Sequence, residues 1–181
     1  MDVSISYFVH GTTLDNEKGH SSGWYDVALS EKGIEQSRAL KEQTKGESFA
    51  AVFCSDLKRA VDSANLTWAD VFPIIIDSRL RECNYGDYNA KASEAVEPMQ
   101  ELCIYKPFPN GESYEDVRAR LADFLKSLRK DYDGQSIAIV AHKAPQLALD
   151  VLLKGMSWEQ AFENDWRKKK AWQPGWEYVL N

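Results

Sequence analysis

Three side chains suited to phosphate chemistry stand close behind apolar runs of the sequence. His10 follows the run Ile5–Val9, His142 follows the run 136–141, and Arg59 lies one turn into the helical segment behind the run 50–54. Two imidazoles and a guanidinium can bind an anion together, and the planar guanidinium fork matches phosphate oxygens. A neutral histidine is also a nucleophile that forms covalent intermediates. These residue types therefore predict phosphoryl transfer through a phosphohistidine.

Each of these side chains alone has a simpler interpretation. A histidine near a strand end is often only hydrogen-bonded, and Arg59 could be a solvated helix residue. In an open parallel sheet, however, ligands bind outside the carboxyl ends of the strands. If the strands are parallel, both histidines and Arg59 share one edge. Backbone N–H groups of Gly11 and of the turn through Thr13 would then add donors for the same anion.

The elements that must position these residues alternate between short β-rich runs and longer helical patterns. This alternation predicts an α/β fold, and the consecutive apolar positions at 50–54 and 137–141 are typical of strands covered on both faces. We expect one domain over residues 1–181, with three layers, a mostly parallel central sheet and helices on both faces. The expected elements are strand 3–9, helix 30–43, strand 50–54, helix 56–71, strand 73–77, helix 113–130, strand 136–141 and helix 144–155.

Local signals support this division of the chain. Ser113 with Asp116 and Ser157 with Gln160 form possible capping boxes, which predict helix starts. Gly155 follows a periodic segment and predicts a helix end.

The remaining segments have weaker patterns. Residues 83–112, with their Asn, Gly and Pro content, are expected to form an irregular cap or insertion over the edge of the sheet. Residues 165–170, which end in three lysines, are interpreted as a solvated helix end. Trp176 to Leu180 predict a last short strand.

Composition excludes several classes of function. The chain has 22 Lys plus Arg against 28 Asp plus Glu, a net charge of -6, which disfavours broad contacts with nucleic acid or anionic membranes. A local basic pocket for a small anion is still compatible with this charge. No apolar run approaches the roughly 18 residues of a membrane span, and the first residues carry no secretion signal. We therefore expect a cytoplasmic protein with neither nucleic-acid nor membrane partners; nothing in the sequence predicts its oligomeric state.

Two other chemistries find little support. Cys54, Cys83 and Cys103 are odd in number and form no CxxC pair, which argues against a disulfide framework or a zinc site. Cys54 precedes Arg59 by one residue too few for a cysteine phosphatase loop and is interpreted as a small buried strand residue. A metal site from His10, His142, Asp56 and Cys54 lacks any metal-binding spacing. No metal and no cofactor is expected.

Successive motifs along the chain resemble those of one family. In order, they are HGTTLDN, GWYDVALSEKGIEQS, SDLKRAVDSA, LRECNYGDY, PNGESYEDVRAR and IAIVAHKAP, and they extend from about residue 3 to residue 150. As a set they are similar to the motifs of the histidine phosphatase superfamily, the phosphoglycerate mutase-like proteins. The resemblance implies the predicted α/β fold and a metal-independent phosphohydrolase that acts on a small phosphorylated substrate.

The resemblance also implies roles for particular residues. His10 is the phosphorylated nucleophile, and Arg59 and His142 hold the phosphoryl group. Glu82 is the general acid and base, a role that one carboxyl can fill by alternating between its two states. Taken alone, Glu82 has a simpler interpretation as a surface residue paired with Arg79 or Arg81. The remaining matched positions are Asn16 at the phosphate site, and Ser22 and Gly23 beside the substrate.

This chain departs from the family motif at several positions. Val9 stands where the motif has an arginine before the nucleophilic histidine, which removes one cation. Lys143 or His20 is a candidate replacement, although both have the simpler interpretation of facing water. The segment after Glu82 also lacks the basic run of the mutases, which favours a phosphatase. Two alternatives stay open: a degenerate member that only binds phosphorylated ligands or a protein partner, and a mutase.

Overall fold

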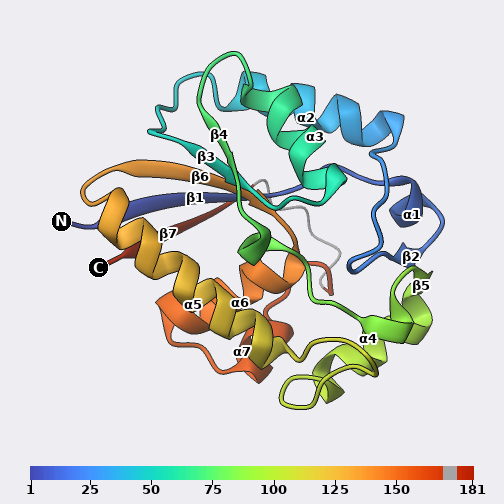
Figure 1. Cartoon of the computed structure of the whole chain (residues 1–181). Coiled ribbons are helices and arrows are strands. Elements are labelled where there is room, and N and C mark those ends of the chain that lie inside the picture. The colour runs from blue at the N-terminus through green and yellow to red at the C-terminus, as the bar shows by residue number, and fades with distance from the viewer. Residues whose placement is uncertain (169–174) are drawn as a thin grey trace.

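The computed structural model, which describes residues 1–168 and 175–181, has three layers around a central sheet (Figure 1). The strand order is β4-β3-β6-β1-β7, and only β7 runs antiparallel to its neighbour. The predicted α/β fold with a mostly parallel sheet is confirmed. The strands are β1 (Val3–Val9), β3 (Val52–Cys54), β4 (Ile74–Ile76), β6 (Ser136–Ala141) and β7 (Trp176–Leu180).

Helices cover both faces of this sheet. Figure 1 shows α2 (Glu31–Gln43) and α3 (Lys58–Trp68) on one face, and α5 (Tyr114–Asp131), α6 (Lys143–Lys154) and α7 (Trp158–Glu163) on the other. Side chains alternate along a strand, so each strand supplies both cores. Phe8 packs in the cluster that contains Trp68 of α3, whereas its neighbour Tyr7 packs in the cluster of α5 and α6. No helix in residues 1–168 is long and apolar enough to cross a membrane.

The local helix signals act as the sequence predicts. Ser113 and Ser157 each cap a helix, and each forms the reciprocal capping box with Asp116 and Gln160. Gly155 ends α6 in the left-handed conformation, with φ of 66°. The helix expected at 144–155 begins one residue earlier, directly after His142.

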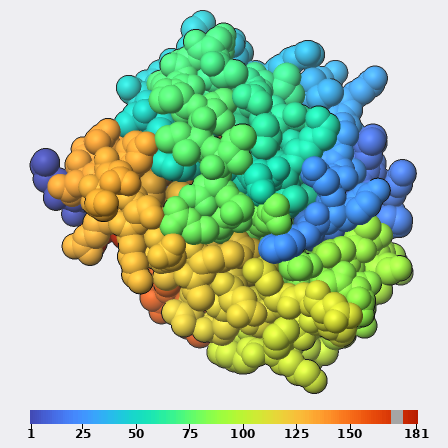
Figure 2. Space-filling model, viewed as in Figure 1, coloured from blue at the N-terminus to red at the C-terminus, as the bar shows by residue number. Residues whose placement is uncertain are grey.

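Residues 83–112 are more regular than expected. They contain the 3-10 helix η2 (Gly86–Tyr88), strand β5 (Lys91–Ala92) and the ten-residue helix α4 (Ser93–Leu102). Strand β5 pairs with β2 (His20–Ser21), which follows the short helix α1 (Leu14–Glu17). Figure 2 shows the chain around β2 in contact with the chain around β5 on the surface of the molecule. The prediction of an irregular cap was therefore wrong for its central part.

The 3-10 helix η1 (Ser78–Leu80) leads from β4 to Glu82.

Candidate active site

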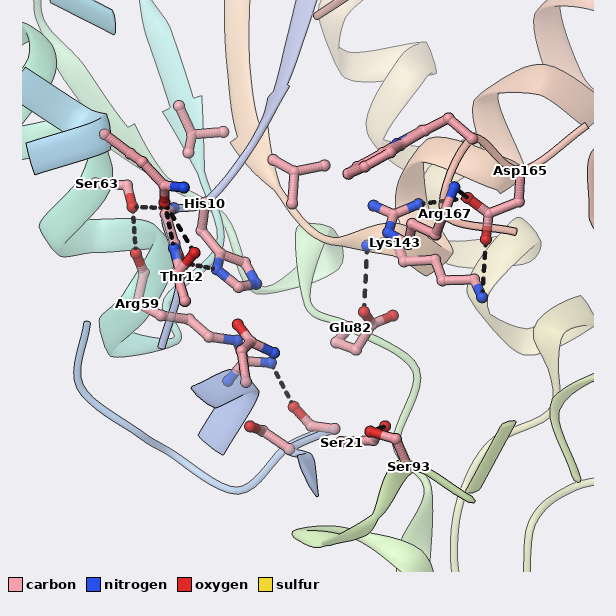
Figure 3. Close-up of a pocket in the computed structure, with 18 of the residues that line it drawn as sticks. His10, Thr12, Ser21, Arg59, Ser63, Glu82, Ser93, Lys143, Asp165 and Arg167 are labelled. Carbon is pink, nitrogen blue, oxygen red and sulfur yellow. Dashed lines mark hydrogen bonds and ion pairs between the residues drawn. The ribbon is translucent and has the colours of Figure 1, made fainter. Parts of the chain in front are cut away.

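The three predicted side chains meet at one edge of the sheet. β1 and β6 are parallel neighbours with Val9 beside Ala141, so the residues that follow them, His10 and His142, lie side by side with ring centroids 5.1 Å apart. Arg59 reaches the same place from the first turn of α3, behind β3. A cavity of about 690 Å³ opens here, and Figure 3 shows His10, Arg59 and Glu82 in its wall.

His10 is held in one tautomer by its own loop. Its Nδ1 lies 2.7 Å from the carbonyl oxygen of Gly11. A carbonyl can only accept, so Nδ1 carries the proton and Nε2 keeps its lone pair. Desolvation and the nearby Arg59 charge lower the pKa of His10 to about 3. Near neutral pH the ring is therefore uncharged and nucleophilic at Nε2.

His142 is completely buried, and the hydroxyl groups of Tyr7 and Ser55 hold it. The Tyr7 hydroxyl donates to the carbonyl of His142 at 2.6 Å and accepts from its backbone N–H at 3.0 Å. Burial, with the Arg59 charge second, places the pKa of His142 well below its usual value. The ring is thus neutral as well.

Ser55 assigns the tautomer of His142. Its Oγ lies 2.6 Å from Nε2 of His142 and accepts the backbone N–H of Leu57. Among the described residues, His142 Nε2 is the one acceptor for the buried Ser55 hydroxyl proton. We therefore assign that proton to the bond with Nε2, which puts the ring proton on Nδ1. Nδ1 is buried without a partner in the described part of the chain, and His142 lies behind the cavity lining, with its ring 5.1 Å from that of His10.

The segment after β2 positions Arg59. Gly23 and Tyr25 accept from its guanidinium at 2.7 and 3.2 Å, and the side chain is almost fully buried. Gly23 has φ of 57°, and a Cβ there would lie 2.0 Å from the Asn89 amide oxygen, so only glycine fits. Ser22 donates to Asp15 at 2.8 Å. Ser22 and Gly23, which the resemblance places beside the substrate, both line the cavity.

Glu82 faces the cavity at the start of α6. Its carboxylate accepts the backbone N–H groups of Lys143 at 3.2 Å and Ala144 at 2.9 Å, which have no partner within the helix. It also accepts the N–H of Cys83 at 2.9 Å. The buried carboxylate is therefore fixed beside His142 by α6. The alternative of a surface residue paired with Arg79 or Arg81 is wrong, because those arginines bind Asp77, Asp123 and Asp56.

The loop after His10 differs from the predicted anion cradle. The N–H of Gly11 donates to Ser63, and the N–H of Thr13 donates to the Asn16 side-chain oxygen. Thr13 is buried and does not line the cavity, because it forms a capping box with Asn16 that begins α1. Gly11 and Asn16 do line the cavity. Since its oxygen is used, Asn16 can meet an anion only through its amide nitrogen.

The two residues predicted to replace the missing arginine at position 9 both lie at the cavity, but the charge of one of them is already paired. Val9 lines the cavity, as do the two predicted replacements, His20 of β2 and Lys143. The Lys143 ammonium, however, lies 3.0 Å from both the Gln100 oxygen and Asp165. Its charge is therefore already paired.

Asp165 contradicts the prediction that residues 165–170 form a solvated helix end. Its carboxylate is fully buried and binds both Lys143 and Arg167, at 3.0 and 2.9 Å. Asp165 can be buried because it forms these ion pairs with residues of the folded protein. The helix pattern of the sequence does not show such contacts, so the segment was predicted to be solvated. Lys169 and Lys170 lie outside the described residues.

Cys54 is buried in β3, and desolvation raises its pKa to about 12, which leaves it a thiol near neutral pH. The described residues contain no cluster of three or more His, Cys, Asp or Glu side chains with metal-binding geometry.

Comparison with known proteins assigns the family. Residues 8–171 match the model of the histidine phosphatase superfamily (branch 1). Adenosylcobalamin/alpha-ribazole phosphatase of Escherichia coli (strain K12) is 31% identical over 156 residues, 81% of this chain and 77% of that protein. A 2,3-bisphosphoglycerate-dependent phosphoglycerate mutase of Methylobacterium sp. (strain 4-46) is 31% identical over 166 residues, 83% of this chain and 80% of that protein.

A solved structure agrees with these matches. The crystal structure of a putative alpha-ribazole-5'-P phosphatase from Escherichia coli K-12 superposes with a TM-score of 0.77 at 26% identity, covering 89% of this chain and 84% of that one. The chain belongs to the histidine phosphatase superfamily.

Proposed function

We propose that this protein is a metal-independent phosphomonoesterase that hydrolyses a small phosphorylated metabolite through a phosphohistidine on His10. One observation carries the proposal: the His10 ring is neutral, its Nδ1–H is held by Gly11, and its Nε2 is left as the nucleophile at a cavity that Arg59 also lines. Relatives named as phosphatases and as mutases both support phosphoryl transfer.

In the proposed first step, Nε2 of His10 attacks phosphorus while the bond to the leaving oxygen breaks and takes its electron pair to that oxygen. Glu82 donates a proton to the leaving oxygen. Arg59 and the Nδ1–H of His142 stabilise the charge on the equatorial oxygens. In the second step Glu82 takes a proton from water, the water oxygen attacks phosphorus, and the N–P bond breaks to restore His10.

The lining of the cap supports a phosphatase over a mutase. The residues that line the cavity from the cap are Tyr85, Ser93, Glu97, Gln100 and Glu101. None of these is basic, so the described part of the cap lines the cavity with no positive charge to hold the acid group of a phosphoglycerate. This supports hydrolysis over transfer to a second phosphorylated acceptor.

The test is a screen of phosphorylated metabolites with a chelator present, followed by rapid quenching in alkali. We expect phosphate release to persist in chelator and an acid-labile phosphoryl group to be trapped on His10. His10→Asn should abolish both signals. Chelator-sensitive release, or rapid turnover without a label on His10, would contradict the mechanism. Binding of phosphorylated compounds without any release would favour the degenerate, ligand-binding alternative.

A further inference from the structure

The proposed substrate carries more negative charge than Arg59 alone neutralises. A phosphate monoester carries a charge of about -1.5 to -2 near neutral pH. His10 and His142 are both neutral, which leaves Arg59 as the one described cation beside them. Among the other described cations of the cavity wall, Lys143 pairs with Asp165 and Lys168 pairs with Glu101.

Arg167 is in a different position. Its Nη1 binds Asp165 at 2.9 Å, but its Nη2 is buried and has no acceptor among the described residues. A buried donor without a partner is costly, and such a group usually meets a ligand or ordered water. Asp165 also carries a single negative charge between two cations, Lys143 and Arg167. This cluster therefore keeps a net positive charge at the cavity wall.

The fold holds Arg167 in place. Its backbone N–H donates to Asp165, and its guanidinium stacks on the Trp166 ring at 4.8 Å. Trp166 in turn packs against Trp176, which pairs with Tyr7, two residues before Val9. Figure 3 shows Arg167 between Asp165 and the wall that carries His10. The Arg167 charge also helps to lower the pKa of His10, after desolvation and Arg59.

We propose that Arg167 binds a phosphoryl oxygen of the substrate through Nη2 and so supplies a second positive charge, which the valine at position 9 does not. This inference rests on the proposed function. Asp165 is then a positioning residue that orients the guanidinium, and Lys143 neutralises Asp165 rather than binding the phosphoryl group.

The test compares Arg167→Gln with Arg118→Gln, a matched change at a surface arginine paired with Glu115. Glutamine retains a polar amide that can donate a hydrogen bond but carries no charge. The probes are inorganic phosphate, measured by calorimetry, and p-nitrophenyl phosphate, whose only ionisable group is the phosphoryl group. A lost charge-assisted hydrogen bond of about 1.5–3 kcal/mol corresponds to about 10- to 150-fold in phosphate affinity and in kcat/KM. Arg118→Gln should change neither.

A rescue experiment separates binding from a structural role. Adding Val9→Arg to Arg167→Gln should recover a large part of the lost affinity, since both positions line the cavity. Unchanged affinity in Arg167→Gln, or a loss that Val9→Arg leaves untouched, would overturn the inference. A loss confined to substrates with a second acid group would overturn it too. If the unaltered protein neither binds phosphate nor hydrolyses any ester, the proposed function itself fails.

Discussion

At the scale of single residues, the reactivity proposed for His10 comes from two neighbours rather than from the histidine itself. The Gly11 carbonyl fixes which nitrogen carries the proton, and Arg59 helps to keep the ring neutral. Glu82 depends on its neighbours in the same way, because two N–H groups of α6 and that of Cys83 hold its carboxylate. Positions that the sequence identifies by residue type therefore acquire their chemistry from neighbouring backbone groups and charges.

Glu82→Gln tests the proposed acid role by changing the leaving group. Glutamine keeps the size of the side chain but cannot donate an acid proton. We expect a loss of about 10²- to 10⁴-fold in kcat for alkyl phosphates and a much smaller loss for phenyl phosphates, whose leaving group needs little protonation. Glu94→Gln, at an exposed position in α4, is the control. Equal losses on both classes of ester would remove Glu82 from the acid role.

Sequence reasoning found the residues that stand at strand ends and missed those that support them across the fold. His10, Arg59 and His142 could be placed together because parallel strands bring their carboxyl ends to one edge. Tyr7 lies 135 positions from His142, and Ser55 lies 87 positions away. No local pattern encodes such contacts. Arg167 was missed for the same reason, because its partner Asp165 is buried and also binds Lys143, 22 positions earlier in the chain.

At the scale of elements, the turn after β1 packs unusually close to the start of α2. A Cβ on Gly33 would lie 2.0 Å from the backbone oxygen of Thr12, and one on Gly11 would lie 2.5 Å from that of Gly33. These glycines let the loop that carries His10 rest directly on a helix. The sequence predicts an anion donor at Gly11, whereas its backbone lies against α2.

Gly33→Ala should accordingly destabilise the protein although alanine is the better helix former. Alanine gains up to about 1 kcal/mol of helix propensity, but the clash with backbone requires a shift that typically costs about 1–3 kcal/mol or more. Gly46→Ala is the matched control, since a Cβ there meets nothing within 4 Å. Urea unfolding measures both. Equal stability of the two variants would show that the turn can relax.

Helix α4 of the cap shows why some helices could not be predicted from the sequence. Helix α4 begins at Ser93, its N-cap residue Ala92 offers no side-chain cap, and it contains Pro98, so neither a start signal nor an uninterrupted pattern marks it. By contrast, the capping boxes of α5 and α7 have the predicted residues. The helix starts at Ser113 and Ser157 were predictable from their polar signals, and helix α4, which buries Val96 and Gln100, was not.

At the scale of the whole molecule, the fold keeps two histidines neutral inside a chain of net charge -6. The unfolded chain restores their ordinary pKa of about 6.5. Burial of His142 and desolvation of the partly buried His10 therefore couple the proposed site to global stability. A site with desolvated histidines at the carboxyl ends of a parallel sheet therefore lowers the stability of the folded protein at acid pH, whereas exposed histidines would not.

The sign of this coupling follows from the lowered pKa of His10. Between pH about 6.5 and about 3 the unfolded chain binds a proton that folded His10 does not, so stability falls as the pH falls through this window. Each such histidine contributes a slope of up to about 1.4 kcal/mol per pH unit. His10→Gln should remove one proton from the uptake on unfolding. Urea unfolding of both proteins between pH 5 and 6.5, where few carboxylates titrate, should therefore show a shallower loss of stability in the variant, and above pH 7.5 the two pH profiles should run parallel. Identical slopes in the acid window would mean that His10 is solvated and able to protonate in the folded protein.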